Sequence, residues 1–331
     1  MMRTEGLYLG IDVGSVSINL VIIDERGKVL KKIYIRTEGK PITILKAAIN
    51  DICKEYNDIS IKGVDTTGSG RQLAGVMVGA DVIKNEITAH AVAVLDTIPK
   101  AGTIIEIGGQ DSKIILIKNG VIVDFAMNTV CAAGTGSFLD RQAARLNIPI
   151  GDFGRLALKS QTPVRIAGRC AVFAESDMVH KQQIGCQSED IIMGLCNALV
   201  RNYLSNVGKG KEIVPDIVFQ GGVAANQGIK LAFENSLGHN LIIPQHYDVM
   251  GALGVALLAQ REVRHKGKTS FRGLMAMKQE FDTRAFECVD CPNSCEVVEF
   301  IGGGHVLVIW GDRCGKWSEN SDHGKSAKIL A

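Results

Sequence analysis

Short apolar runs alternate with turn residues through the first third of the chain. Two runs, at 7–13 and 17–24, enclose a turn of small residues, and a third strand-like run, VLKKIYI, follows the turn ERGK. Two later segments, 41–57 and 85–98, repeat apolar residues at helical spacing, and a strand that ends in a glycine turn separates them. Strands and helices in this order predict an α/β fold.

The same pattern starts again at residue 103. TIIEIGGQDSKIILIKNGVIVDFAMN repeats the opening order of strand, glycine turn, strand, turn and strand. The matched pairs are Asp12 with Glu106, Gly14 with Gly108, Ser17 with Asp111, and Gly27 with Gly120. Chance similarity of two hairpins is the alternative, but the acidic residue, the glycines and both turns all keep register. We therefore predict an internal duplication, and two similar lobes with a ligand cleft between them.

The rest of the second half is expected to be mostly helical. The expected helices are at about 132–146, 151–159, 171–183 and 188–207. A strand at 216–220, the turn GGVAAN, a helix from Gln227 and a last helix at 248–261 follow, and the charged stretch REVRHKGK then resembles a linker. The predicted organisation is a two-lobed domain over 1–265, with repeats at about 1–100 and 101–265, and a cysteine-rich tail at 270–331.

Composition narrows the class of protein. Hydrophobic residues make up 46% of the chain and charged residues 22%, which is ordinary for a globular protein. A net charge of +2 and 5% aromatics give no case for nucleic acid or an acidic membrane as partner. The polar start and the absence of a long apolar run predict a cytoplasmic protein, in which the nine cysteines stay reduced.

Three glycine-containing turns have the composition of phosphate-binding loops. Backbone N–H groups in such turns can point at phosphate oxygens, and carboxylates suit a hydrated Mg²⁺. The first loop supplies Asp12, Gly14, Ser15 and Ser17; the second supplies Glu106, Gly108, Gly109, Gln110 and Asp111; the third supplies Gly221, Gly222 and Asn226. A single glycine turn is weak support, whereas three in this order form a distinctive set.

The three loops together resemble the phosphate-1, phosphate-2 and adenosine motifs of the actin, Hsp70 and sugar-kinase superfamily. The resemblance implies a duplicated two-lobed ATPase fold with ATP and Mg²⁺ in the interlobe cleft. Asp12 and Glu106 would then act at the metal. A kinase of this group has an acidic base beside its sugar hydroxyl, and we find no such candidate. Gln110 would more naturally orient a water, so hydrolysis of ATP is favoured over phosphoryl transfer.

Two cysteines, Cys131 and Cys170, are each expected where a helix begins. An isolated cysteine is usually a small buried residue, but a helix N-terminus carries partial positive charge that stabilises a thiolate or an anionic cluster. Two thiolates cannot complete an iron–sulfur cluster that takes four, whereas a symmetric homodimer can supply both cysteines from each subunit. A cluster at a dimer interface is therefore the leading interpretation, and a redox-active thiol pair is the alternative.

Five short strings are distinctive: NTVCAAGTGSF, RCAVFAES, IGGQDSK, EITAHA and GGVAAN. Together they resemble the activators of 2-hydroxyacyl-CoA dehydratases, also called archerases. That family includes the ATPase subunits of benzoyl-CoA reductase, and the resemblance covers residues 7–260. It implies a homodimer with one bridging [4Fe-4S] cluster, held by Cys131 and Cys170. ATP hydrolysis would drive an electron from a ferredoxin or flavodoxin to an iron–sulfur dehydratase, a reductase or a double-cubane cluster protein. Lowering a potential by several hundred millivolts takes roughly 10 kcal/mol.

The chain departs from that family at two positions. Many members have Asp where this chain has Glu106, and Lys where it has Asn19. The effect of both departures on catalysis stays open. One alternative function is a small-molecule kinase of the same fold, of the amino-sugar type, with Cys131 and Cys170 structural. Another is a redox or metal sensor that uses the ATPase fold as a switch.

The tail holds four further cysteines at ligand-like spacing. Cys288, Cys291 and Cys295 lie close together, and Cys314 follows after a longer interval. Four thiolates fit either tetrahedral Zn²⁺ or a second [4Fe-4S] cluster, and the sequence does not decide between them. The segment 297–317 is expected to form a β-hairpin that needs such a cross-link. Four remaining residues are interpreted as structural: Cys53, Cys186, Cys196 and His90.

Overall fold

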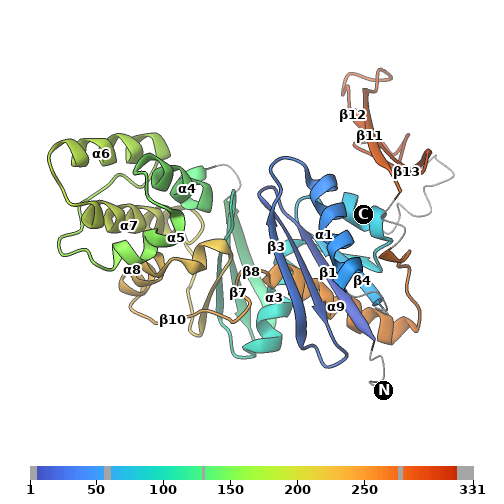
Figure 1. Cartoon of the computed structure of the whole chain (residues 1–331), viewed down its shortest axis with the longest axis horizontal. Helices are drawn as coiled ribbons and strands as arrows, with labels where there is room; N and C mark the ends of the chain where they lie inside the picture. The colour runs from blue at the N-terminus through green and yellow to red at the C-terminus, as the bar shows by residue number, and fades with distance from the viewer. Residues whose placement is uncertain (1–5, 56–60, 129–130, 275–278, 319–331) are drawn as a thin grey trace. The chain divides into compact units, whose positions relative to one another are not determined.

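The computed structural model describes residues 6–55, 61–128, 131–274 and 279–318 (Figure 1). Expectations for residues 1–5, 56–57 and 129–130 therefore lie outside the described residues. The chain divides into two compact units: unit 1 comprises residues 1–92 and 251–331, and unit 2 comprises residues 93–250. No helix among the described residues is long and apolar enough to cross a membrane.

A five-stranded mixed sheet forms the centre of unit 1. Its order is β3-β2-β1-β4-β5, with β1 antiparallel to β2 and parallel to β4. The strands are β1 (Leu7–Val13), β2 (Ser17–Ile23), β3 (Val29–Arg36), β4 (Ile61–Thr67) and β5 (Val82–Ile83). Apolar side chains fill β1 and β2 because both faces of these inner strands are covered, whereas β3 alternates between half-buried and exposed positions as an edge strand does.

The sheet of unit 2 repeats this topology strand for strand. Its order is β8-β7-β6-β9-β10, again with two antiparallel pairs followed by two parallel ones. The strands are β6 (Thr103–Ile107), β7 (Ser112–Lys118), β8 (Val121–Asn128), β9 (Ile217–Gln220) and β10 (Leu241–Ile242). The first turns match as well: Gly14 N donates to Ser17 O at 2.9 Å, and Gly108 N donates to Asp111 O at 3.1 Å. The predicted duplication is confirmed.

Four helices belong wholly or mainly to unit 1. They are α1 (Pro41–Glu55), α2 (Arg71–Val78), α3 (Glu86–Thr97) and α9 (Met250–Lys266). Helix α2 was not predicted from the sequence. The prediction that residues 261–266 belong to a linker is wrong, because α9 continues through them. Small residues allow α9 to pack closely: a β-carbon on Gly10 would lie 1.9 Å from Ala252 O.

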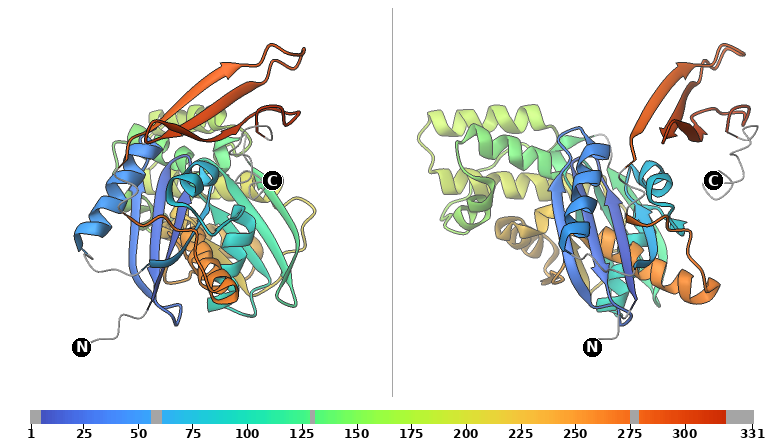
Figure 2. Two further views of the ribbon diagram at one scale, coloured as in Figure 1. Left: turned by 90° about the vertical axis from the view of Figure 1, so that its right-hand side faces the viewer. Right: turned by 45° about the vertical axis from the view of Figure 1, so that its right-hand side comes forward.

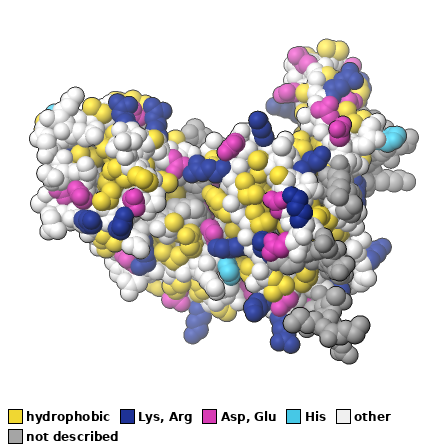
Figure 3. All heavy atoms as spheres, in the orientation of Figure 1, with side chains coloured by type: hydrophobic (Ala, Val, Ile, Leu, Met, Phe, Trp, Pro, Cys, Tyr) yellow, Lys and Arg dark blue, Asp and Glu magenta, His cyan; other side chains and the backbone are white. Residues whose placement is uncertain are grey.

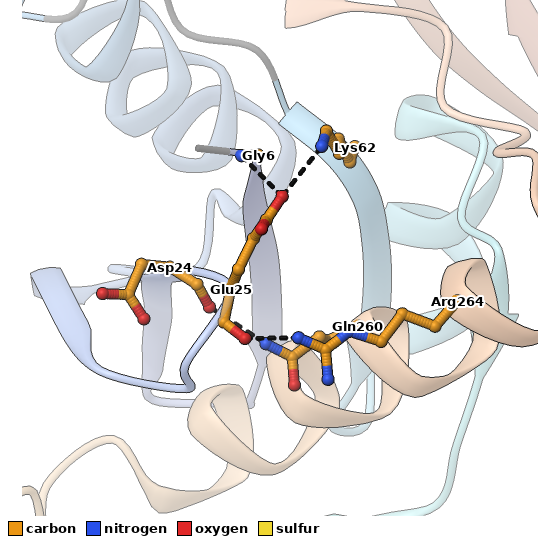
Figure 4. Close-up of polar contacts among 6 residues, drawn as sticks. All are labelled: Gly6, Asp24, Glu25, Lys62, Gln260 and Arg264. Carbon is orange, nitrogen blue, oxygen red and sulfur yellow. Dashed lines mark hydrogen bonds and ion pairs between the residues drawn. The ribbon is translucent and has the colours of Figure 1, made fainter. Parts of the chain in front are cut away.

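The C-terminal half of α9 is fixed to the turn between β2 and β3 and, through that turn, to β4 (Figure 4). Gln260 Nε2 donates to Asp24 O at 3.0 Å, and the Arg264 guanidinium donates to Glu25 O. The Glu25 carboxylate in turn accepts from Gly6 N and Lys62 Nζ at 3.0 and 2.8 Å. These contacts explain why the charged end of α9 stays helical.

Most of unit 2 outside its sheet is helical, as predicted. The α-helices are α4 (Gly136–Arg145), α5 (Ile150–Ala157), α6 (Ala171–Gln183), α7 (Ser188–Asn206) and α8 (Gln227–Leu237). Helix α7 supplies the centre of the core, where the Tyr203 ring meets the Phe233 ring edge-on at 5.3 Å. The single helix expected at 132–146 is in fact a 3₁₀ turn, η1 (Ala132–Gly134), followed by α4.

The tail forms a three-stranded antiparallel sheet, visible in both views of Figure 2. It contains β11 (Phe281–Glu287), β12 (Glu296–Gly302) and β13 (His305–Trp310), so the expected hairpin is confirmed and β11 extends it. Phe300 is fully buried, and it joins Val308 in the same hydrophobic cluster as Ile49 and Ile52 of α1. The tail sheet thus shares the core of unit 1.

Candidate functional site

The sheet of unit 1 places three oxygen-bearing side chains in one row at the end of β1. Asp12 pairs directly with Asn19 of β2 and with Thr67 of β4, so the three side chains lie on the same face. Asn19 Oδ1 and Thr67 Oγ1 are buried, and neither atom has a hydrogen-bond partner among the described residues. Buried polar atoms are normally satisfied, so this row has the character of a site for a ligand or ordered water.

Two glycines leave room for the Asp12 carboxylate. Gly68 has a φ of 92°, and a β-carbon there would lie 2.5 Å from Asp12 Oδ1. A β-carbon on Gly251, in the first turn of α9, would lie 2.3 Å from Asp12 Oδ2. The turn that follows β1 is held in place by a hydrogen bond, in which Thr37 Oγ1 donates to Ser15 O at 2.8 Å. Substitution at either glycine would displace the carboxylate.

The equivalent row of side chains in unit 2 contains different residues. Glu106 of β6 pairs with Lys113 of β7 and with Gln220 of β9. Lys113 is 2% exposed, and its ammonium lies 3.0 Å from Glu106 Oε2 and 2.9 Å from Asp111 Oδ1. Lys113 therefore forms ion pairs with both Glu106 and Asp111, whereas the position across from Asp12 holds the uncharged Asn19. Asp12 and Glu106 are equivalent in the fold but differ in their electrostatic surroundings.

The second and third loops lie beside Glu106. Gly221 has a φ of 88°, and a β-carbon there would lie 2.7 Å from Glu106 Oε1, which repeats the relation of Gly68 to Asp12. Gly108 and Gly109 are partly exposed and Gln110 is exposed, so a ligand can reach this turn. Gly222 opens a 3₁₀ turn, η2 (Gly222–Ala225). The side chain of Asn226 accepts from Ile229 N as the N-cap of α8, which gives it a structural role.

Cys131 and Cys170 lie in neighbouring loops of unit 2. Cys170 is the N-cap residue of α6, as predicted. Cys131 also lies where a helix begins, as predicted, but it is the N-cap residue of the 3₁₀ turn η1 and α4 follows only from Gly136. Its Sγ lies 3.9 Å from Arg169 O, the carbonyl next to Cys170 along the chain. Both cysteines are partly exposed.

Asparagine side chains hold the two cysteine loops together. Asn202 of α7 donates to Gly168 O at 2.6 Å, and its Nδ2 lies 3.9 Å from Cys131 Sγ. Asn128 forms two hydrogen bonds with the backbone of Cys131. Cys131 N donates to Asn128 Oδ1 at 2.9 Å, and Asn128 Nδ2 donates to Cys131 O at 2.7 Å. The backbone around Cys131 is therefore fixed at both ends.

The Cys131 loop also continues into the second phosphate loop. Gly136 N donates to Gly108 O at 2.9 Å. Ser137 donates to Gly109 O twice, from its backbone N at 2.8 Å and from its Oγ at 2.6 Å. A short stretch of chain thus connects Cys131 with the loop that carries Gly108 and Gly109.

The remaining cysteines differ in their surroundings. Cys196 is buried in the core of unit 2, where burial raises the pKa of its thiol to about 12, and Cys53 and Cys186 pack against the two cores. Their interpretation as core residues is confirmed. Within the described ranges, no three His, Cys, Asp or Glu side chains are arranged to hold a metal ion. A metal at the tail quartet stays a prediction.

Several residues of these sites were missed by the sequence analysis. Lys113 could have been found, because a hairpin centred on residues 108–111 pairs it with Glu106. Gly68 could have been found as the counterpart of Gly221 after the equivalent strand. Asn202 gave no sequence signal, since it lies 71 positions from Cys131 and meets it through tertiary packing.

Comparison with known proteins decides the family. Residues 9–259 match the BadF/BadG/BcrA/BcrD ATPase family. The chain belongs to this family. The tail at 270–331 lies beyond the matched residues.

Related proteins have the same fold and are named as activators. The (R)-2-hydroxyglutaryl-CoA dehydratase activating ATPase of Acidaminococcus fermentans is 35% identical, over 77% of this chain and 97% of its own length. The crystal structure of component A of that dehydratase matches with a TM-score of 0.73 at 33% identity, covering 78% of this chain and 99% of the other. The 2-hydroxyisocaproyl-CoA dehydratase activator of Clostridium difficile, solved with bound ADPNP, gives a TM-score of 0.71 at 33% identity, covering 79% and 97%. The prediction of a duplicated α/β ATPase is confirmed.

Proposed function

We propose that this ATPase is an electron-transfer activator that works as a homodimer with one bridging [4Fe-4S] cluster. Cys131 and Cys170 of each subunit are the ligands, and ATP hydrolysis drives the electron to an iron–sulfur dehydratase, a benzoyl-CoA reductase-like enzyme or a double-cubane cluster protein. A ferredoxin or flavodoxin supplies the electron. The names of the related activators support the partner class.

The observation that carries the proposal is the direct connection between the second phosphate loop and the cysteine pair. Gly136 and Ser137 bond to the carbonyls of Gly108 and Gly109, and Cys131 lies five residues before Gly136. A shift of the loop on nucleotide binding would therefore be transmitted to Cys131 through backbone hydrogen bonds.

The row at Asp12 fits a hydrated Mg²⁺. This ion keeps several waters and takes few protein ligands directly, and its waters are strong hydrogen-bond donors. Asn19 Oδ1 and Thr67 Oγ1, buried without a partner in the described structure, can accept from such waters while Asp12 supplies the negative charge. Glu106 is less suited to the metal, because the Lys113 ammonium lies directly beside its carboxylate and would repel a second cation. We therefore assign the Mg²⁺ to Asp12 rather than to Glu106.

The remaining loop residues then take distinct roles. Phosphate oxygens are bound by backbone N–H groups of the turns at 14–17 and 108–111, other than those of Gly14 and Gly108, which donate within their own turns. The exposed Gln110 orients the attacking water, and Lys113 holds Glu106 and Asp111 in place behind it. A residue that orients water acts mainly in the transition state, so Gln110 should affect turnover more than ATP binding.

The surroundings of the cysteine pair fit a shared cluster. Both thiols are partly exposed and lie in adjoining loops, so a second subunit can reach them. Val172 and Phe173, which follow Cys170 in the first turn of α6, are 68% and 65% exposed. Figure 3 shows apolar side chains gathered on the surface of the helical part of this unit. Exposed apolar groups of this kind are what a subunit interface covers. When bound, the cluster supplies one-electron chemistry at low potential.

The test compares Cys131→Ser and Cys170→Ser with Cys186→Ser as the matched control. Each of the first two changes removes two cluster ligands per dimer. We expect both variants to have about four fewer irons per dimer than the wild type, with the visible absorption of the cluster lost and ATP binding retained. Electron delivery to any acceptor should vanish, whereas Cys186→Ser should behave as wild type.

The result is the difference in iron content between variant and wild type. Any metal bound by the tail is present in both proteins and therefore does not affect this difference. A Cys131→Ser protein with full iron and full electron transfer would overturn the activator proposal and favour the kinase alternative. Sugar-dependent consumption of ATP would support that alternative directly.

A further inference from the structure

The four tail cysteines all lie at one end of the three-stranded sheet. Cys288 directly follows β11, Cys295 directly precedes β12, and Cys291 lies in the turn between them. Cys314 comes shortly after β13, which pairs with β12 so that Trp310 meets Val298. The topology of the sheet therefore brings cysteines that are up to 26 positions apart to the same end.

Backbone contacts already hold the first three cysteines in a compact turn. Cys288 N donates to Cys295 O at 2.8 Å, which closes the hairpin. Ser294 N donates to Cys291 O at 3.2 Å, and Ser294 has a φ of 43°, a left-handed conformation typical of tight turns. The Cys288 thiol lies 3.3 Å from Asp290 Oδ2.

Two further contacts connect the segment of Cys314 to this turn. An ion pair joins Lys316 with Asp290, which lies between Cys288 and Cys291. The rings of Trp317 and Phe286 meet edge-on with centroids 4.9 Å apart. Each contact links a residue close to Cys314 with a residue close to Cys288. The chain segments are thus already adjacent, and the exposed side chains of Cys291 and Cys314 can turn toward Cys288.

This end of the sheet has little hydrophobic core of its own. Between 287 and 297 the buried residues are Cys288 and Val297, and Val289 is 86% exposed. The tail residues buried in the core of unit 1, Phe300 and Val308, lie farther along β12 and β13. A small sheet end without a core is commonly stabilised by a disulfide or a structural metal, and reduced thiols favour the metal.

We propose that Cys288, Cys291, Cys295 and Cys314 form a structural Zn²⁺ site. Four thiolates give the closed tetrahedral coordination of structural zinc. Each thiol loses its proton on binding, so four protons go to solvent, and the nearby Lys316 ammonium offsets part of the resulting negative charge. Zinc suits this position better than an iron–sulfur cluster, because Cys291 and Cys314 are exposed to solvent. The site is independent of the proposed electron-transfer function.

The test measures zinc, iron and sulfide in the anaerobically purified full-length protein. We expect about one zinc per chain in the wild type and in a Cys53→Ser control. Cys291→Ser and Cys314→Ser should each lose that zinc while iron stays at the wild-type level. Both cysteines are exposed in turns, so neither substitution removes core packing. Hydrogen exchange of the β11 and β12 amides should become faster in these two variants and unchanged in the control.

Each other outcome contradicts the proposal in a different way. Iron and sulfide lost with Cys291→Ser, at about four each per chain, would assign the quartet to a cluster and overturn the zinc site. Metal content unchanged in both variants would show that the quartet binds no metal. Loss of iron with Cys131→Ser is a separate result, so failure of the zinc site and failure of the activator proposal are distinguishable.

Discussion

At the scale of single residues, two equivalent acidic positions have acquired different electrostatics. Asp12 faces the uncharged Asn19 across its hairpin, whereas Glu106 faces Lys113. An ammonium beside a buried carboxylate repels a second cation, so Lys113 weakens the attraction of Glu106 for a metal ion. The departures from the family pattern at positions 19 and 106 thus bear on where the metal binds.

The assignment of Mg²⁺ to Asp12 is tested by removing an acceptor beside it. Asn19→Leu keeps similar volume but cannot accept from a metal-bound water, so the Mg²⁺ needed for half-maximal ATP hydrolysis should rise about tenfold, equivalent to about 1.4 kcal/mol. Asp12→Asn should abolish Mg²⁺-dependent hydrolysis. Titration of Mn²⁺ followed by its paramagnetic resonance measures the metal affinity without reference to activity.

Ser112→Ala is a suitable control for these variants. Ser112 is buried in β7 next to Lys113, and its side chain points to the opposite face of the sheet. The metal affinity of the Ser112→Ala protein should match that of the wild type. An Asn19→Leu protein with unchanged Mn²⁺ affinity would show that the unpartnered oxygens do not bind metal waters.

A second residue-scale feature is the buried Asp65 of β4. Burial raises the pKa of its carboxyl to about 8, and the charges of Asp81 and Glu262 act in the same direction. The Val82 N–H, which donates to Asp65 at 2.7 Å, and the nearby Lys84 act in the opposite direction. Asp65 therefore keeps its proton in the folded protein at neutral pH.

This raised pKa predicts a pH-dependent stability. The unfolded carboxyl loses its proton near its ordinary value of 3.8, so folding takes up a proton between about pH 4 and pH 8. The free energy of unfolding should consequently fall as pH rises through that window. Asp65→Asn cannot ionise and should be more stable than wild type by a few kcal/mol at about pH 8, with a smaller difference at about pH 5. Urea unfolding at several pH values measures this, and a pH-independent difference would contradict it.

At the scale of elements, the start of α4 connects two sites in unit 2. Its first residues, Gly136 and Ser137, donate to the carbonyls of the second phosphate loop, and Cys131 directly precedes η1, the 3₁₀ turn before α4. The backbone at Cys131 is also fixed by Asn128 and the neighbouring loop by Asn202. Motion at either site must therefore be accommodated by the other.

Ser137→Ala should weaken this connection without removing either site. The variant loses the 2.6 Å hydroxyl bond to Gly109 O and keeps the backbone bond. One hydrogen bond contributes about 1 kcal/mol, so ATP affinity should change by less than about tenfold. The effect of ATP on the rate at which a chelator extracts cluster iron should decrease clearly.

Ser176→Ala is the matched control, since its exposed hydroxyl bonds within α6 at 3.1 Å from Val172 O. That variant should respond to ATP as the wild type does. If Ser137→Ala also keeps the full response of iron extraction to ATP, the connection through α4 does not carry the coupling.

At the scale of the whole molecule, unit 1 is completed by chain that is distant in sequence, whereas unit 2 is one continuous segment. Unit 1 is completed by α9, whose Gly254 packs against Ala89 so closely that a β-carbon would lie 1.9 Å from the Ala89 carbonyl oxygen. The tail then adds Phe300 and Val308 to the same core. The cysteine-rich segment is therefore part of unit 1 in packing, although it lies beyond the residues that match the family.

The sequence by itself determined the duplication, the three loops and the cysteine pair. These features depend on local order: the alternation of apolar runs and turns sets each hairpin, and a hairpin fixes which residues pair across it. Asp12, Glu106, Gly14 and Gly108 were found for this reason. The family resemblance then rested on short strings such as NTVCAAGTGSF and IGGQDSK.

Tertiary structure alone decided which distant residues complete each site. Asn202 reaches Cys131 from α7, Gly251 makes room for Asp12 from α9, and Thr67 joins the Asp12 row from a parallel strand. Parallel pairing and helix packing join segments separated by long crossovers, so no local pattern records their register. The helix expected at 132–146 was interrupted for the same reason, because Gly136 and Ser137 bond to the phosphate loop. The sequence specifies the chemistry of each side chain, but tertiary packing determines which other residues that side chain contacts.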